Sequence, residues 1–241
     1  MEPTAGGRPE HRGAVSVHPT SGHEERAARD LAALEDWLRE AVGRPSPRIG
    51  RSGAVCPFTT PALRAGALDS VLRYDVDGSS PDLVRTVVYE AMRSFTARHR
   101  KEGEPLKGTR LECEVVAFPL IGPAHWSVID KVHPELKDVA VELGLMLGQF
   151  HPACDERAAR NPLFPVARSP YPLFAIRFMA PHDVLFLNGE RRWFERYREN
   201  FPEEAAGAFR DPFMRGLAAE ASRRFAPSPV GTPRGRGGER R

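Results

Sequence analysis

The stretch Leu173-Phe174-Ala175-Ile176-Arg177-Phe178-Met179 is the most apolar segment of the chain that predicts a β-strand, and Arg177 is its only charged residue. The Pro-rich residues 161–172 precede it and are predicted to be extended, because a proline disfavours helical backbone at the residue before it. Residues 183–187 follow the Ala180-Pro181 turn and predict a partner strand. The late part of the chain therefore predicts strands of a sheet.

Two further strands are predicted earlier. Residues 71–76 alternate apolar and charged side chains, and residues 111–120 alternate before they become wholly apolar, as a strand that enters a core does. Apolar spacing, capping patterns and proline positions predict helices at residues 21–41, 60–66, 81–95, 126–150, 155–160, 190–200 and 203–225. This order of elements predicts an α/β or α+β fold with a small mixed sheet of about four strands.

Length and composition describe one globular domain. The chain has 241 residues, of which 41% are apolar and 8% aromatic, as in ordinary soluble proteins. Residues 1–20 and 227–241 are rich in Gly and Pro and are predicted to be disordered arms. Residues 21–226 are predicted to form a single domain, which is large enough to bury roughly 70% of its unfolded surface without a stabilising metal.

The net charge of +3 lies entirely in the C-terminal segment. Residues 226–241 contain four arginines and one glutamate, so 4 − 1 = +3, and residues 1–225 are neutral. A neutral body without a basic helix argues against a specific nucleic-acid partner. No run approaches the roughly 18 apolar residues of a membrane span, and the first 24 residues lack the apolar core of a signal peptide. We expect a cytoplasmic protein with no membrane partner.

The standard catalytic signatures are absent. The sequence contains no G-x-x-x-x-G-K-[ST], no G-x-G-x-x-G between a strand and a helix, no G-x-S-x-G and no H-E-x-x-H. These absences argue against P-loop ATPases, Rossmann dehydrogenases, serine hydrolases of the elbow type and zincins. Three cysteines, Cys56, Cys113 and Cys154, are too few and too widely spaced for a disulfide framework.

The first candidate site is His151-Pro152-Ala153-Cys154, at the end of a predicted helix. Imidazole and thiolate are good ligands for haem iron and zinc, and a helix N-terminus after Cys154 would lower the pKa of its thiol. The alternative is structural: the histidine caps helix carbonyls and the small thiol packs in the core.

The second candidate is Cys56-Pro57-Phe58, in a glycine-containing loop before a predicted helix. A Cys-Pro step is a recurrent haem contact, and it also fits a buried loop anchored by Phe58. A zinc site built from Cys56, His151, Cys154 and His182 would lack the paired, closely spaced ligands of structural zinc modules. We therefore predict no metal site, and haem is the only cofactor predicted.

The third candidate is the region from Arg177 to Asp183. An arginine within an apolar strand needs an anion if it points inward, because an unpaired buried charge is very costly. That anion could be a substrate carboxylate, or Asp183 or Glu156 in a structural ion pair. His182 and Asp183 could also supply a base and its orienting partner for a cysteine in a thiol hydrolase.

Several segments resemble an actinobacterial domain of unknown function, number 6875 of that series, over about residues 25–225. They are Gly53-Ala54-Val55-Cys56-Pro57-Phe58, Gly148-Gln149-Phe150-His151-Pro152-Ala153-Cys154, Arg160-Asn161-Pro162-Leu163-Phe164-Pro165-Val166, Ser169-Pro170-Tyr171-Pro172-Leu173-Phe174-Ala175-Ile176-Arg177 and His182-Asp183-Val184-Leu185-Phe186-Leu187.

More distantly, the layout is similar to the YqcI/YcgG family. The similarity lies in a Cys-Pro loop before an Ala-Leu helix, an acid-capped helix, a strand that ends near Phe-Pro, and a Pro-rich lead into an apolar strand. Some members of that family are haem-dependent oxygenases that hydroxylate nitrogen in guanidine or amino-acid substrates. The resemblance implies a tailoring enzyme of specialised metabolism that acts on a small molecule.

Our leading hypothesis from the sequence is therefore a haem-dependent oxidoreductase. His151 is the first candidate for the iron ligand, with Cys154 and Cys56 as further cofactor-binding candidates. Arg177 would anchor a substrate carboxylate, and His182 and Asp183 would serve proton transfer. The alternatives are a cofactor-free binding or partner protein, and a thiol-dependent hydrolase.

Overall fold

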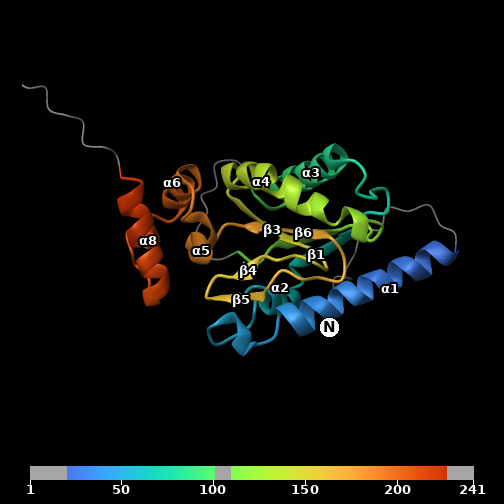
Figure 1. Cartoon of the computed structure of the whole chain (residues 1–241), viewed down its shortest axis with the longest axis horizontal. Coiled ribbons are helices and arrows are strands. Elements are labelled where there is room, and N and C mark those ends of the chain that lie inside the picture. The colour runs from blue at the N-terminus through green and yellow to red at the C-terminus, as the bar shows by residue number, and fades with distance from the viewer. Residues whose placement is uncertain (1–20, 101–109, 227–241) are drawn as a thin grey trace, which may run out of the picture.

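The computed structural model describes residues 21–100 and 110–226, so the disorder predicted for residues 1–20 and 227–241 lies outside the described residues. The described chain forms one mixed α/β domain, as predicted (Figure 1). The strands of its main sheet lie in the order β1 (Leu68–Leu72), β2 (Cys113–Ala117), β6 (Leu173–Phe178) and β3 (Leu145–Phe150).

Strand β6 lies inside the sheet and corresponds to the apolar stretch 173–179. It pairs antiparallel with β2 on one side and with β3 on the other. Strand β1 pairs in parallel with β2, and a parallel pair needs a crossover connection, which contains α3 (Pro81–His99). The strand predicted at residues 111–120 is confirmed as β2. The strand predicted at residues 71–76 is wrong at its C-terminal end, because β1 spans Leu68–Leu72 and residues 73–76 lie outside it.

Helices cover both faces of the sheet (Figure 1). Successive side chains of a strand point to opposite faces, so each strand contributes side chains to both layers. In β6, Phe174 packs in a core shared with α3 and α4 (Ser127–Glu142). Leu173 packs in a second cluster with α1 (Ser21–Trp37), and α2 (Thr59–Ala65) lies on the same side as α1. Burial on both faces explains why β6 is almost continuously apolar.

The predicted helices at residues 21–41, 60–66 and 81–95 are confirmed. The first is α1 followed by the π-helical η1 (Leu38–Val42). Helix α3 begins at its predicted cap, where the Ser80 hydroxyl accepts a hydrogen bond from the backbone N–H of Leu83. The remaining short helical segments are η2 (Pro47–Ile49), η3 (Pro123–His125) and η4 (Pro181–Asp183).

The helix predicted over residues 126–150 is wrong at its C-terminal end. Helix α4 ends at Glu142, and residues 145–150 form β3. Gly144 has a φ of 73°, a left-handed conformation that ends a helix and turns the chain. The apolar residues of this segment fit both helical and strand spacing, so periodicity alone could not separate the two.

The strand predicted at residues 183–187 is also wrong. The chain there forms η4 and then α5 (Val184–Leu187). A proline in the first turn favours a helical start, and the Asp183 carboxylate accepts a hydrogen bond of 2.7 Å from the backbone N–H of Ala180. Local capping therefore outweighs the apolar composition that suggested a strand.

The helix predicted at residues 155–160 is wrong, because this part of the chain contributes to a small second sheet. Strand β4 (Arg157–Ala158) pairs antiparallel with β5 (Asn161–Pro165). Strand β5 agrees with the extended conformation predicted for the Pro-rich segment.

The C-terminal helices pack against the α3–α4 core. Helix α6 (Arg191–Asn200) confirms the helix predicted at residues 190–200. The segment predicted as one helix over residues 203–225 contains two, α7 (Pro202–Ala205) and α8 (Pro212–Arg224). Gly207 between them has a φ of 98°, which a helix cannot accommodate.

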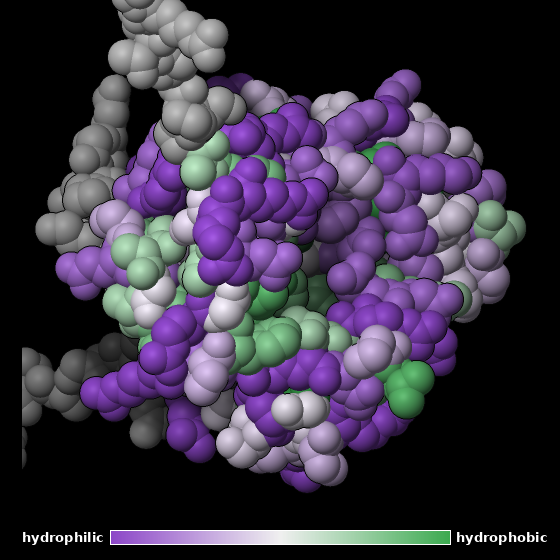
Figure 2. Space-filling model, turned by 60° about the vertical axis from the view of Figure 1, so that its left-hand side comes forward, coloured by the Kyte–Doolittle hydropathy of each residue, from purple (hydrophilic) through white to green (hydrophobic). Residues whose placement is uncertain are grey.

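The face of the molecule shown in Figure 2 is mostly hydrophilic, and apolar side chains gather around a depression near its centre. Among the exposed large apolar side chains of the described residues, Leu163 is the most exposed. Some exposed apolar side chains are normal on a protein surface. Within the described ranges, no helix has both the length and the apolar character needed to cross a bilayer.

Asp30 joins α1 to the rest of the domain. Its carboxylate accepts hydrogen bonds from the hydroxyls of Tyr74, at 2.7 Å, and Tyr171, at 2.8 Å. Burial and the hydrogen bond to Asp30 raise the pKa of Tyr171 to about 12, so this hydroxyl remains a donor over the physiological range of pH. One carboxylate thus links three segments that are distant in sequence.

We expect Asp30→Ala to lower the free energy of unfolding by about 2–3 kcal/mol, because two part-buried hydroxyls lose a charged acceptor. Asp36→Ala, at an exposed position on the same helix, should change it by less than about 0.5 kcal/mol. Urea denaturation of the two variants measures the difference. Equal effects would show that the two tyrosine contacts contribute no net stability.

Candidate functional site

Three potential ligand side chains meet where β3 ends and α4 begins. They are Asp130 in the first turn of α4, and His151 and Cys154 just after β3. One ligand atom from each lies within 4.8 Å of the other two. The closest contact joins His151 Nε2 and Asp130 Oδ2 at 3.0 Å. The structure thus brings together two residues singled out in the sequence and one that sequence reasoning missed.

The local fold explains this meeting. Strand β3 ends at Phe150, so His151 leaves the sheet at its edge next to the start of α4. The backbone N–H of Cys154 then donates a hydrogen bond of 3.0 Å to the carbonyl of His151. This turn folds the H-x-x-C segment back on itself and places both side chains on the same side. Only the tertiary contact between β3 and α4 adds Asp130.

The three side chains differ in exposure. His151 is 4% exposed and Cys154 is 1% exposed, while the Asp130 side chain remains 47% exposed. Burial raises the pKa of the Cys154 thiol, and the nearby carboxylates of Asp130, Glu156 and Asp155 raise it further, against a backbone hydrogen bond at Glu156 that lowers it. The thiol is therefore neutral at physiological pH unless a cation displaces its proton, which argues against a nucleophilic thiolate.

The imidazole of His151 has an unsatisfied nitrogen. Nε2 faces Asp130, but Nδ1 is buried and has no hydrogen-bond partner within the described part of the chain. The side-chain oxygen of Gln149, two residues earlier, is likewise buried without a described partner. Buried polar atoms almost always have a partner, so two orphaned atoms this close in sequence indicate a place where a ligand or an ion could bind.

Zinc fits this donor set better than haem does. Carboxylate oxygen, imidazole nitrogen and thiolate sulfur are the three ligand types of zinc in proteins. A haem iron would need an open space in front of a free imidazole nitrogen. Here His151 Nε2 already contacts Asp130, Nδ1 has no described partner but is buried, and the two cavities described for this chain are lined by other residues. Haem gains no support from this geometry and stays a prediction.

The four-residue zinc site weighed from the sequence does not form. Cys56 and His182 lie with Arg177 instead, in a second group around the ring of Phe58. The Arg177 guanidinium lies 4.6 Å from the centre of that ring, and the centre of the His182 ring lies 6.3 Å from it, with the two rings nearly perpendicular. Cys56 is close enough to influence Arg177 electrostatically.

Within this second group, Arg177 forms a two-point ion pair with Asp183. Nη1 donates to Oδ2 at 2.8 Å and Nη2 donates to Oδ1 at 2.5 Å. The Asp183 side chain is 1% exposed and that of Arg177 is 17% exposed. Burial alone would lower the pKa of Arg177, but Asp183 raises it above its usual value, with smaller contributions from Cys56 and Cys113.

The structure thus forms one of the ion pairs considered from the sequence, with Asp183 and not with Glu156. The Asp183 carboxylate also holds the backbone N–H of Ala180, so both of its oxygens are engaged. The roles predicted for Arg177 in substrate binding and for His182 and Asp183 in proton transfer stay predictions. The geometry itself supports a structural role for the pair.

A sequence signal for Asp130 exists, although it is weak. Asp130 lies in the first turn of a predicted helix, where acidic residues are common for electrostatic reasons alone. Only the contact between α4 and β3 distinguishes it from other acidic residues in first turns, such as Asp82 of α3.

Comparison with known families agrees with the resemblance found in the sequence. Residues 31–211 match the profile of the family described as "Domain of unknown function (DUF6875)". No curated protein and no solved structure matches the chain. The family match spans all four strands of the main sheet and both groups of site residues. Since it covers well over half of the sequence, the chain belongs to the DUF6875 family.

Proposed function

We propose that the chain is a zinc-dependent enzyme that acts on a small molecule, with the metal held by Asp130, His151 and Cys154. One observation carries the proposal: oxygen, nitrogen and sulfur donors from these three residues lie within 4.8 Å of one another. Within this group, His151 Nε2 is the imidazole nitrogen that lies beside the Asp130 carboxylate, at 3.0 Å from Oδ2.

The spacing needs little adjustment to hold zinc. Ligand bonds of about 2.0–2.3 Å place neighbouring ligand atoms of a tetrahedral site roughly 3.3–3.6 Å apart. The Asp130 and His151 atoms are already 3.0 Å apart. Cys154 lies within the same group, so small side-chain rotations complete the site. Two negative charges would attract zinc to this site. One is the Asp130 carboxylate, and the other is the thiolate that forms when the metal displaces the Cys154 proton.

A set of three protein ligands favours catalysis over a purely structural role. Structural zinc sites use four protein ligands, whereas catalytic sites use three and leave one position for water or substrate. Asp130 is the most exposed of the three residues that would hold the metal. Zinc lowers the pKa of a bound water to about 7 and so supplies a hydroxide for hydrolysis. Hydrolysis of a polar bond in a small substrate is the reaction class that we infer.

We expect the full-length protein, purified after expression with zinc and a haem precursor supplied, to contain about one zinc ion per chain by elemental analysis. His151→Ala should retain less than about one tenth of that zinc, because it removes the central ligand. Cys56→Ser is the matched control, since Cys56 lies in the other group, and it should retain all of its zinc.

Other outcomes of the same purification would contradict the proposal. A Soret absorption band in place of zinc, lost in His151→Ala, would instead support the haem-dependent oxygenase. Protein with neither zinc nor haem, even after incubation with zinc, would leave the cofactor-free binding protein as the better hypothesis. Equal zinc content in the native protein and His151→Ala would show that any zinc binds elsewhere.

A further inference from the structure

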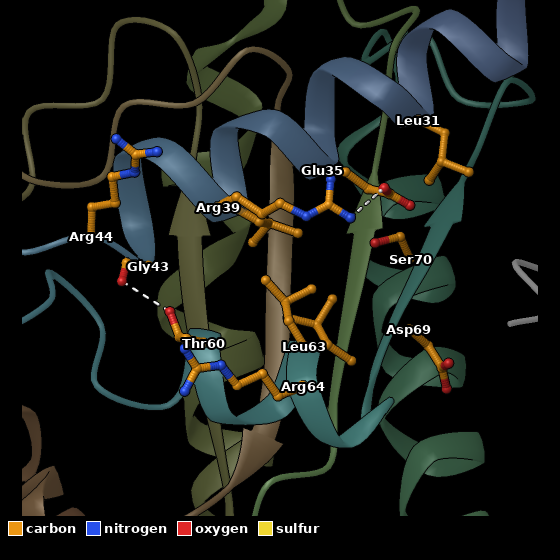
Figure 3. Close-up of a pocket in the computed structure, with 12 residues that line it drawn as sticks. Leu31, Glu35, Arg39, Gly43, Arg44, Thr60, Leu63, Arg64, Asp69 and Ser70 are labelled. Atoms are coloured by element: carbon orange, nitrogen blue, oxygen red, sulfur yellow. Dashed lines mark hydrogen bonds and ion pairs between the residues drawn. The ribbon is translucent and has the colours of Figure 1, made fainter.

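A cavity of about 680 Å³ lies on the opposite side of the main sheet from α3 and α4, between α1, η1, α2 and β1 (Figure 3). Its residues are separate from Asp130, His151 and Cys154. Small-molecule sites in proteins typically enclose about 300–1,000 Å³, with apolar walls and a few polar groups. The volume and the lining of this cavity fit that description.

The walls of the cavity are held in place by a specific contact. The Thr60 hydroxyl at the start of α2 donates a hydrogen bond of 2.9 Å to the carbonyl of Gly43, just after η1. A Cβ atom at Gly43 would lie 2.8 Å from the Thr60 hydroxyl oxygen, so only glycine permits this approach. The two helical segments are therefore fixed relative to each other, and the space between them is a built feature of the fold.

Basic side chains dominate the polar part of the cavity. Arg39, Arg44 and Arg64 all line it. Arg39 is paired with Glu35 at 2.9 Å and Arg44 with Glu40 at 2.7 Å, in each case four residues apart on one helical surface. Exposed pairs of this kind are weak, so a bound anion can compete with the glutamates for these arginines.

Arg64 differs from the other two arginines. It lies in the last turn of α2, and it has no hydrogen bond or ion pair to any other residue in the described ranges. Figure 3 shows the Arg64 side chain directed toward Thr60, whereas the Arg44 guanidinium lies beyond Gly43 and points away from Arg64. Arg44 is exposed and pairs only with Glu40 in the described ranges, so rotation of its side chain would allow both guanidinium groups to contact one bound anion.

The remaining acidic residue at the cavity does not cancel this charge. Asp69 is aligned with Glu114 on the neighbouring parallel strand, so the two side chains share a face of the sheet. Glu114 forms an ion pair with Arg98 of α3, which places that face opposite the cavity. The side chain of Asp69 accordingly points away in Figure 3. On the cavity side, the leucines Leu31, Leu63 and Leu68 supply the apolar wall.

We propose that this cavity binds a small organic anion with an apolar body, whose carboxylate, sulfonate or phosphate group is held by Arg64 and Arg44. The apolar body lies against the leucines of α1, α2 and β1. Planar guanidinium groups match such anions with two hydrogen bonds each. The proposal is independent of the zinc centre, because none of its residues belongs to that site.

Titration with 8-anilinonaphthalene-1-sulfonate tests the proposal, since this fluorescent probe combines a sulfonate with apolar rings. We expect saturable binding of one molecule per folded, full-length chain. Arg64→Gln should weaken the affinity about tenfold or more, because it removes a charged hydrogen-bond donor. Glu40→Gln should strengthen it by up to about fivefold, because Arg44 loses its competing partner.

The matched control is Arg198→Gln. Arg198 is exposed, lies in the last turn of α6 as Arg64 lies in that of α2, and forms no described ion pair. This variant should bind the probe with native affinity. Nile red, an apolar dye without an anionic group, should have the same affinity for the native protein and for Arg64→Gln, which would tie the effect of Arg64 to the charge of the probe.

Two results would overturn the proposal. The first is probe binding that is absent, or that stays unsaturated across the titration. The second is an affinity that Arg64→Gln and Glu40→Gln leave unchanged while circular dichroism shows both variants folded. Opposite shifts from these two variants support the proposal, since a purely structural role of either residue would not strengthen binding.

Discussion

Asp183→Ala should lower the free energy of unfolding by about 3–5 kcal/mol, the largest stability effect that we expect from a single polar substitution in this protein. Its carboxylate is 1% exposed and forms two hydrogen bonds to Arg177 and one to the backbone of Ala180. Removal of the carboxylate leaves a buried guanidinium without its counter-charge. It also removes the acceptor that stabilises the turn leading into α5.

Denaturant unfolding of matched variants measures this effect. Asp75 provides the control, because it forms a similar two-point pair with Arg73 but its side chain is 57% exposed. Asp75→Ala should cost no more than about 1 kcal/mol. Adding Arg177→Met to Asp183→Ala should recover part of the lost stability, because it removes the uncompensated charge. A cost for Asp183→Ala as small as that of Asp75→Ala would mean that water or another group compensates Arg177.

Cys154→Ser should lower the affinity of the protein for cobalt(II), used as a spectroscopic substitute for zinc, by at least about 100-fold. Cobalt bound to a thiolate has a near-ultraviolet charge-transfer band, and that band should be present in the native complex and absent from the variant. The Cys154 sulfur is the ligand at this site that most favours zinc-like metals. The serine hydroxyl that replaces it stays protonated and binds these metals weakly. Titration of metal-free protein measures both effects.

Two further variants make the cobalt experiment decisive. Cys113→Ser is the matched control, because Cys113 lies on β2, outside the three-residue group, and it should preserve the band. Asp130→Asn, at a half-exposed position that tolerates the change, should weaken binding about tenfold or more while the thiolate band remains. A band that survives in Cys154→Ser would exclude Cys154 as a ligand, and an Asp130→Asn variant with native affinity would exclude Asp130.

Local patterns predicted much of the fold. Capping residues and 3.6-residue spacing predicted α1, α2, α3 and α6, and the apolar stretch 173–179 predicted the central strand. Two predictions were wrong where the local sequence is compatible with both helix and strand. Residues 143–150 have apolar spacing that fits either, and residues 183–187 are apolar enough for a strand although the residues before them cap a helix. Pairing with β6 decided the first case, and the contacts of Asp183 decided the second.

The candidate sites, like the fold, could be predicted from the sequence only in part. His151 and Cys154 could be identified from the sequence, because they are rare residue types at ligand-like spacing, and so could Arg177, because it is a charge within an apolar strand. Their partners could not be identified. Asp130 is 21 positions from His151, and its place beside that imidazole results from the packing of α4 against β3.

The amino-acid sequence by itself determined the α/β class, the family, the neutral body and the residues that deserve testing. The tertiary structure alone decided which of those residues meet: it joined His151 and Cys154 to Asp130, paired Arg177 with Asp183, and assembled Arg44 and Arg64 around one cavity. The physical reason is that propensity, capping and periodicity act over a few neighbouring residues, whereas a site depends on side chains brought together by burial of apolar surface across the whole domain.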